Sequence, residues 1–375
     1  MKGIPGYGLV ILLVTYVAVA VTVELVWTKE CIGSGGDGDG GDGGDGDDEE
    51  DQLCNQEGTN NQISGWVTDF FVAIVMTLLT IHMIHYRPPA REHDLATTDH
   101  HDANKHRRVR TSMIVVLAGA AVAYYSGGLS HSVFANTGLD DGLGHIGFWI
   151  TWILGYGGLT VATVGLYIFG TTVHKEYSTF DDNNNRSRSS ICGVTALRMF
   201  VAFNVLAYIG ITVGCMWCLL TPSLHTSSVN DSVNKDDPDV STPTCVNLFA
   251  NAENVWFISQ PLCFLPLARL LMPILRQHAQ VTHVWGIPPP TALKGSTVAM
   301  WTLGFMFFPY MAFVSIIVLQ SDDLGADYAT IRGPIIHHAG VLISYYLMHA
   351  VGIALPISNG IDENNSHNIN INIGA

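Results

Sequence analysis

Seven of the sixteen histidines in this 375-residue chain lie within or at the ends of long apolar segments. They are His82, His85, His131, His145, His337, His338 and His349. Ionisable side chains are costly in apolar surroundings, so these histidines are candidates for a functional role. Neutral imidazoles with nearby carboxylates suit Zn²⁺, and a catalytic zinc typically has three protein ligands and one water. The chemistry that these residue types favour is metal-assisted hydrolysis.

Seven apolar segments must position these residues. They run approximately over 65–85, 111–134, 145–170, 192–220, 253–276, 296–319 and 334–356. Each has about the 20 apolar residues that a helix needs to cross a bilayer. The chain is 48% hydrophobic and 13% charged, which excludes an ordinary soluble enzyme. We therefore predict an all-α polytopic membrane protein with a seven-helix transmembrane bundle over residues 65–356.

Charges between the segments predict their orientation. Lys and Arg are concentrated in the connections 86–110 and 171–191, and such connections lie in the cytoplasm. The N-terminus is then outside, and residues 357–375 form a polar cytoplasmic tail. The sequon at Asn230 falls in an outer connection and is a predicted glycosylation site. One or two disulfides could form on that side between Cys31, Cys54, Cys218 and Cys245. We expect an integral membrane protein of the secretory pathway or plasma membrane.

This topology brings several polar residues to the outer level of the bundle. They are His131, His145, His337, His338, Asp69, Asp140, Asp141 and Ser126. His131, His145 and one of His337 and His338 could supply three zinc ligands, because adjacent helical residues point about 100° apart and cannot both reach one ion. The carboxylates and the hydroxyl would activate water or support the ligands. The alternative is that the histidines only form hydrogen bonds between helices.

A second group of histidines is predicted at the inner level. His82 and His85 end the first span, and His349 lies about 16 Å deeper than His338 on nearly the same helical face. Two haem b groups are the alternative cofactor, with His82 and His349 as the inner axial pair and His131 or His145 with His338 as the outer pair. His82 and His85 are equally well explained as interfacial residues.

The order of these residues resembles that of the seven-span hydrolases that include alkaline ceramidases and progestin/adiponectin-type receptors. In that superfamily a Ser and a His late in the second span, an Asp early in the third and a His early in the seventh hold a zinc. The similar positions here are Ser126 or Ser130 with His131, Asp140 or Asp141, and His337 or His338. The chain departs from the pattern because four residues, not three, separate Ser126 from His131, and no HxxxH follows in the seventh span.

This resemblance implies a metal-dependent hydrolase that cleaves a lipid amide such as a ceramide. It implies that His131, His145 and His338 bind the metal, with His145 filling the missing ligand position. Asp140 would then orient or deprotonate the water, and Ser126 would assist the oxyanion. Asp69 and Asp141 would support the ligands from behind. A receptor-like or structural protein without catalysis and a haem electron carrier are the alternatives.

The N-terminal residues are predicted to lie outside the bundle. Residues 1–20 are expected to be a cleavable signal peptide, because Lys2 precedes an apolar run with small residues at Ala18 and Ala20. An uncleaved anchor is the alternative. Residues 21–64, rich in Gly and Asp, should form a flexible acidic segment. The net charge of −15 argues against nucleic acid as a partner and leaves membrane lipid as the expected one.

Overall fold

The computed structural model describes residues 10–22, 63–85, 100–134, 142–177, 184–221, 262–274, 314 and 335–353. Its elements are α3 (Ile63–His85), α4 (His100–Leu129), the π-helical turn η1 (Ser130–Phe134), α5 (Gly142–Tyr177) and α6 (Asn184–Leu220). Shorter helices cover Val10–Thr22 and Leu262–Ile274, and a further helix covers residues 335–353. The described residues are thus all helical, which confirms the predicted class.

Four of these helices are long and apolar enough to cross a membrane. They are Gly65–His85, Asn104–Phe134, His145–Tyr177 and Gly193–Leu220, and they fall on the first four predicted segments. The fifth predicted segment contains the helix Leu262–Ile274, and the seventh contains the helix at 335–353. The sixth lies outside the described residues apart from residue 314. The count of seven spans and their orientation stay predictions.

Several helices extend beyond the predicted segments. α4 begins at His100, so much of the connection expected at 86–110 is helical. This stretch of α4 contains Lys, Arg and Ala and neither Gly nor Pro, so nothing in it ends a helix. α5 and α6 have 36 and 37 residues, which at about 1.5 Å per residue exceeds the roughly 30 Å of hydrocarbon. The helices therefore reach well past the membrane core.

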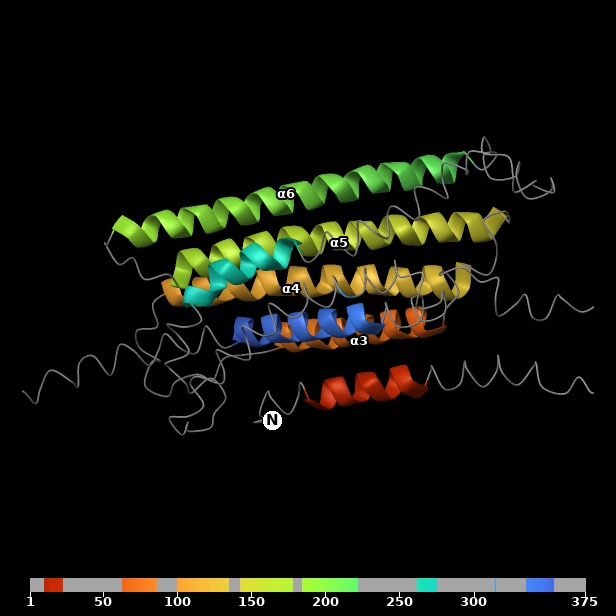
Figure 1. Ribbon diagram of the computed structural model, residues 1–375, viewed down its shortest axis with the longest axis horizontal. Coiled ribbons are helices and arrows are strands. Elements are labelled where there is room, and N and C mark those ends of the chain that lie inside the picture. Colours follow the sequence, from red (N-terminus) through yellow and green to blue (C-terminus); the bar gives the residue numbers. More distant parts are fainter. Residues whose placement is uncertain are drawn as a thin grey trace, which may run out of the picture.

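α4 and α5 pack closely along a seam of small residues. A side-chain carbon added at Gly158 would lie 2.7 Å from the backbone nitrogen of Ala123, and one added at Gly119 would lie 2.6 Å from that of Ala162. Small residues four apart let two helix backbones approach in this way. Since 119 faces 162 and 123 faces 158, the two helices are antiparallel. Figure 1 shows α3 to α6 side by side along the long axis.

The remaining contacts fix the directions of the other helices. Asp69 lies against Gly127 and Arg110 donates to the carbonyl of Ile84, so α3 is antiparallel to α4. The helix at 335–353 has its start near Tyr124 and its end near Met83 and Met113, so it runs parallel to α3. The helix Leu262–Ile274 pairs residue 263 with 204 and residue 270 with 193. It is therefore antiparallel to α6.

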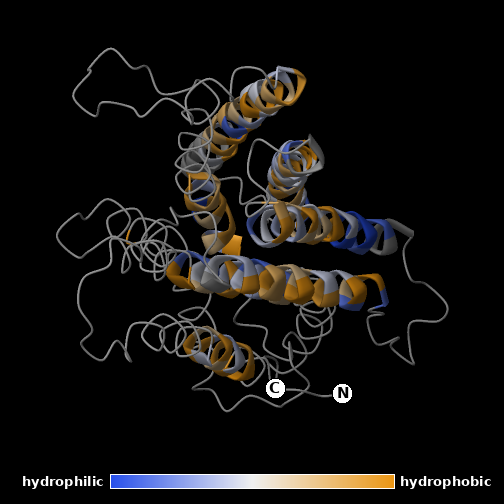
Figure 2. Cartoon of the chain, turned by 90° about the vertical axis from the view of Figure 1, so that its right-hand side faces the viewer, coloured by the Kyte–Doolittle hydropathy of each residue, from blue (hydrophilic) through white to orange (hydrophobic). Residues whose placement is uncertain are grey.

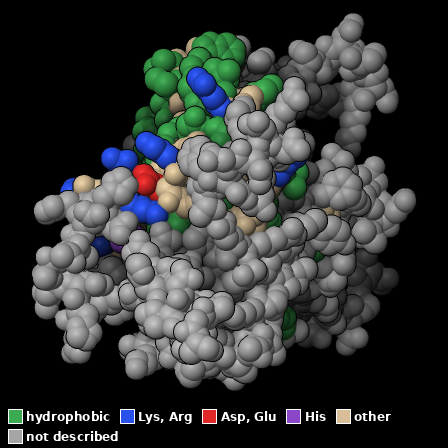
Figure 3. All heavy atoms as spheres, turned by 90° about the vertical axis from the view of Figure 1, so that its left-hand side faces the viewer, with side chains coloured by type: hydrophobic (Ala, Val, Ile, Leu, Met, Phe, Trp, Pro, Cys, Tyr) green, Lys and Arg blue, Asp and Glu red, His purple; other side chains and the backbone are tan. Residues whose placement is uncertain are grey.

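Basic side chains gather at one end of the bundle. The start of α4 and the end of α5 meet there, with Arg108 3.4 Å from Glu176 and the Lys105 ammonium 4.1 Å from the Tyr177 ring centroid. Figure 3 shows this end. A single basic face is what the positive-inside rule predicts for one membrane surface. At the opposite end of the bundle, Cys218 is disulfide-bonded.

Hydrophobic residues occur along the length of the helices, as the colours in Figure 2 show. On α6, Met199, Phe203 and Leu206 are more than half exposed. Such large exposed apolar residues are unusual on a soluble protein, and here they continue along successive turns of one helix. A lipid environment explains them without further assumption.

Candidate functional site

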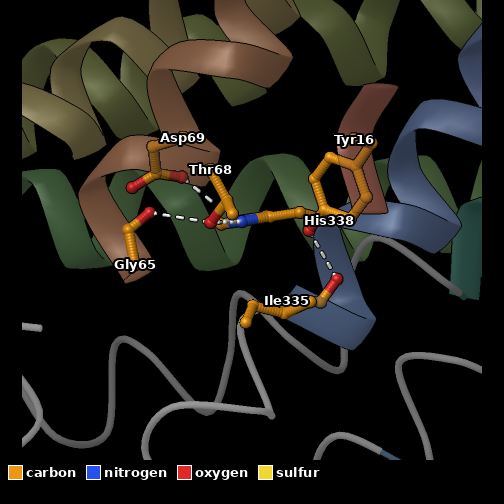
Figure 4. A network of polar contacts seen from close by, with 6 residues as sticks. All are labelled: Tyr16, Gly65, Thr68, Asp69, Ile335 and His338. Atoms are coloured by element: carbon orange, nitrogen blue, oxygen red, sulfur yellow. Dashed lines mark hydrogen bonds and ion pairs between the residues drawn. The ribbon is translucent and has the colours of Figure 1, made fainter. Parts of the chain in front are cut away.

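A buried carboxylate and a buried imidazole join α3 to the helix at 335–353. Asp69 Oδ1 lies 3.0 Å from His338 Nε2, and the two side chains are 7% and 8% exposed. Figure 4 shows Asp69 on α3 pointing toward His338 on the neighbouring helix. Burying either group without the other would be costly, so the pairing explains how both fit inside the bundle.

The second ring nitrogen of His338 is engaged by a hydroxyl. Thr68 Oγ1 lies 2.7 Å from His338 Nδ1, and the same hydroxyl donates to the carbonyl of Gly65 at 2.9 Å. Thr68 is 0% exposed. We call Thr68, Asp69 and His338 the outer site, after the predicted orientation of the bundle. It forms one continuous chain of hydrogen bonds from carbonyl to hydroxyl to imidazole to carboxylate.

α4 closes the outer site from the third side. The Tyr124 ring meets the His338 ring edge-on, with centroids 5.5 Å apart. Gly127 faces Asp69, where an added side-chain carbon would lie 3.1 Å from Oδ2. Glycine at this position therefore leaves room for the carboxylate between the two helices.

A histidine pair joins the same two helices near their other ends. His82 Nδ1 lies 3.0 Å from His349 Nε2, and the ring centroids are 5.0 Å apart. We call these two residues the inner pair. The structure thus places together the two histidines proposed as inner haem ligands, but their nitrogens contact each other directly. A haem iron between them would require the two rings to separate, so this arrangement does not fit bis-histidine ligation.

The other predicted zinc ligands lie among aromatic rings. His131 packs edge-on against Trp152 at 5.7 Å, and His145 lies 6.4 Å from Trp149. His337 is 1% exposed and its ring is 5.6 Å from that of His338. Within the described ranges, no three His, Cys, Asp or Glu side chains are grouped so that they could hold a metal ion.

The predicted catalytic residues are placed only in part. Ser126 is 6% exposed and faces Gly155 of α5. Ser130 is fully buried at the start of η1, and its hydroxyl makes no hydrogen bond to the described part of the chain. Asp140, Asp141 and the sequon at Asn230 lie outside the described residues. Both ring nitrogens of His338 are already engaged, so a zinc ligated by His338 would have to displace Thr68 or Asp69.

Three residues in or beside the outer site were not expected from the sequence: Thr68, Gly127 and Tyr16. Thr68 precedes Asp69 in an apolar run, and a hydroxyl beside a membrane-depth carboxylate is a signal that could have identified it. Nothing in the sequence distinguishes Gly127 from the other glycines of α4. Tyr16 belongs to the segment expected to be removed, and its hydroxyl donates to the carbonyl of Ile335 at 2.6 Å.

Comparison of the chain with protein-family models, with curated proteins and with solved structures gives no match.

Proposed function

We propose that the chain is a membrane protein that moves protons across the bilayer, using the outer site and the inner pair as its two proton-binding stations. The observation that carries this proposal is the buried hydrogen-bond chain from Thr68 through His338 to Asp69. Chains of Asp, Glu and His inside membrane helices are the groups by which pumps and transporters pass protons.

The hydrogen-bond donors of the outer site support a route for proton exchange. When Thr68 donates to the Gly65 carbonyl, its oxygen is the acceptor in the hydrogen bond with His338 Nδ1. The proton between His338 Nε2 and Asp69 Oδ1 then belongs to an ion pair or to a neutral pair, depending on which atom holds it. A proton leaves Nδ1 through Thr68 when the hydroxyl hydrogen turns from the Gly65 carbonyl to a water molecule and the oxygen takes the Nδ1 proton. Asp69 then gives its proton to Nε2 and takes up the next one. The site therefore passes a proton without leaving an isolated buried charge.

Apolar packing separates the two stations. Asp69 and His82 are about 20 Å apart along α3 at 1.5 Å per residue. On α3 the buried residues between them are Val72, Ala73 and Met76. On the helix at 335–353 they include the apolar Val341 and Leu342 and two hydroxyl-bearing residues, Ser344 and Tyr345. A hydrogen bond spans about 2.8 Å, so these two hydroxyls do not bridge the distance between the stations. We infer that the outer site and the inner pair load from opposite sides and exchange through a conformational change.

The proposal predicts that Thr68→Val slows proton flux. In liposomes with an internal pH dye and an imposed potential, we expect the wild type to take up protons faster than protein-free liposomes. Losing one hydrogen bond of this kind should reduce the rate about fivefold. Thr77→Val is the matched control, because Thr77 lies on the same helix and donates only to the Ala73 carbonyl. Equal rates for Thr68→Val and Thr77→Val would reject the role of the outer hydroxyl.

A zinc-dependent lipid amide hydrolase is the second candidate. It is favoured by the meeting of α3, α4 and the helix at 335–353 around Asp69, Gly127 and His338, which is the level at which the sequence predicts the metal. This function requires His338 to exchange a present partner for the ion. We expect the wild type to contain stoichiometric zinc and His338→Ala to lose it if this candidate is right. Plasma emission spectrometry measures the zinc content of the two purified proteins. A metal-free wild type would eliminate the hydrolase as a candidate.

A further inference from the structure

The helix Val10–Thr22 has two distinct faces. Tyr16 is 1% and Ala20 5% exposed, so these residues, one turn apart, form the buried stripe. The opposite surface is exposed and mostly aliphatic, with Val10, Ile11, Val14, Val17 and Val21. The exposed Thr15 and Thr22 donate their hydroxyls to carbonyls of the same helix. A buried stripe with an apolar outer surface is the pattern of a bundle helix that faces lipid, because the outer surface needs no polar residues there.

Tyr16 makes contacts that a removable segment would not need. Its hydroxyl donates to the carbonyl of Ile335 at 2.6 Å, and its ring meets that of Phe71 edge-on at 5.6 Å. Figure 4 shows Tyr16 beside the outer site, with its hydroxyl directed at Ile335. Removing residues 1–20 would leave both Phe71 and the Ile335 carbonyl without these partners. Exposing a packed aromatic ring and losing a buried hydrogen bond both destabilise a fold.

From these contacts we infer that residues 10–22 are retained in the mature protein as a permanent helix of the bundle, and that Tyr16 is a positioning residue for His338. Ile335 lies three residues before His338, which is about one helical turn. The phenol therefore ties the first turn of this helix to the N-terminal helix and limits how far the imidazole can move from Asp69. This inference does not depend on proton transport.

The first test is the identity of the N-terminus. The full chain is expressed with a tag at the C-terminus only, so that processing is not disturbed, and the purified protein is digested and its N-terminal peptide identified by mass spectrometry. We expect a peptide that contains Tyr16 and begins at Met1 or Lys2. A mature N-terminus at or near Val21 would overturn the inference.

The second test measures how much the Tyr16 hydroxyl stabilises the start of the helix at 335–353. In Tyr16→Phe, which keeps the ring, we expect hydrogen–deuterium exchange of residues 335–345 to become about fivefold faster, as for the loss of one hydrogen bond. Tyr125→Phe is the control, since Tyr125 is 36% exposed. Unchanged exchange in Tyr16→Phe would show that Tyr16 does not position this helix. Both tests read out structure, so they succeed or fail separately from the proton-flux assay.

Discussion

Asp69→Asn is expected to reduce proton flux to the rate of protein-free liposomes. The amide has nearly the same shape as the carboxylate and can still accept from His338 Nε2, which lies 3.0 Å from Asp69 Oδ1. It cannot take up or release a proton at that atom under ordinary conditions. The substitution therefore removes the terminal proton carrier while it keeps the contact. The same pH-dye liposome assay measures the effect.

Two comparisons make this result specific. Glu176→Gln removes a carboxylate that pairs with the exposed Arg108 at the basic end, and it should leave the flux unchanged. Asp69→Ala should instead lower stability, since removing one member of a buried charge pair costs about 3–5 kcal/mol. Wild-type flux in Asp69→Asn would refute proton transfer at the outer site and would favour a purely structural pairing.

Gly158→Ala is expected to destabilise the bundle by about 2–3 kcal/mol, as for overpacking a close interface. The added carbon would lie 2.7 Å from both the Ala123 nitrogen and the Gly119 oxygen. Both are backbone atoms, so no side chain can move aside and α4 and α5 must separate. The midpoint of thermal aggregation in detergent, followed by size-exclusion fluorescence, measures the loss.

The neighbouring glycine provides the control. An added carbon at Gly157 meets nothing within 4 Å, so Gly157→Ala should leave the midpoint unchanged or raise it slightly through better helix propensity. If Gly157→Ala and Gly158→Ala lower the midpoint equally, the effect comes from the helix backbone and not from the seam.

Much of the helical framework was predictable because membrane spans are recognised by the length of their apolar segments. The first four predicted segments coincide with four long apolar helices. Helix ends were less predictable. Hydropathy locates the part of a helix that lies in the hydrocarbon, but the backbone hydrogen bonds of the helix can continue beyond that part. That is why α4 begins at His100 among basic residues. The sequence alone does not distinguish a signal peptide from a retained helix at Val10–Thr22, because both have an apolar core and small residues.

The sequence predicted the level of the site residues along the bundle, but not the rotation of each helix about its own axis. Asp69 and His338 were expected at one level, and the structure joins them. Which side of each helix faces inward could not be read, because residues exposed to lipid, such as Leu78 and Leu154, are as apolar as buried Val72. The grouping of His131 and His145 with His338 rested on depth alone. Their aromatic contacts with Trp152 and Trp149 depend on rotation.

The directions of the last two described helices bear on the number of spans between them. The helix Leu262–Ile274 is antiparallel to α6, whereas the contacts with α3 make the helix at 335–353 parallel to α3. With α3 to α6 alternating, both late helices run the same way. Residue 274 and residue 335 therefore lie at opposite ends of the bundle. The span predicted at 296–319 is consistent with these directions, because a single crossing joins opposite ends of a bundle.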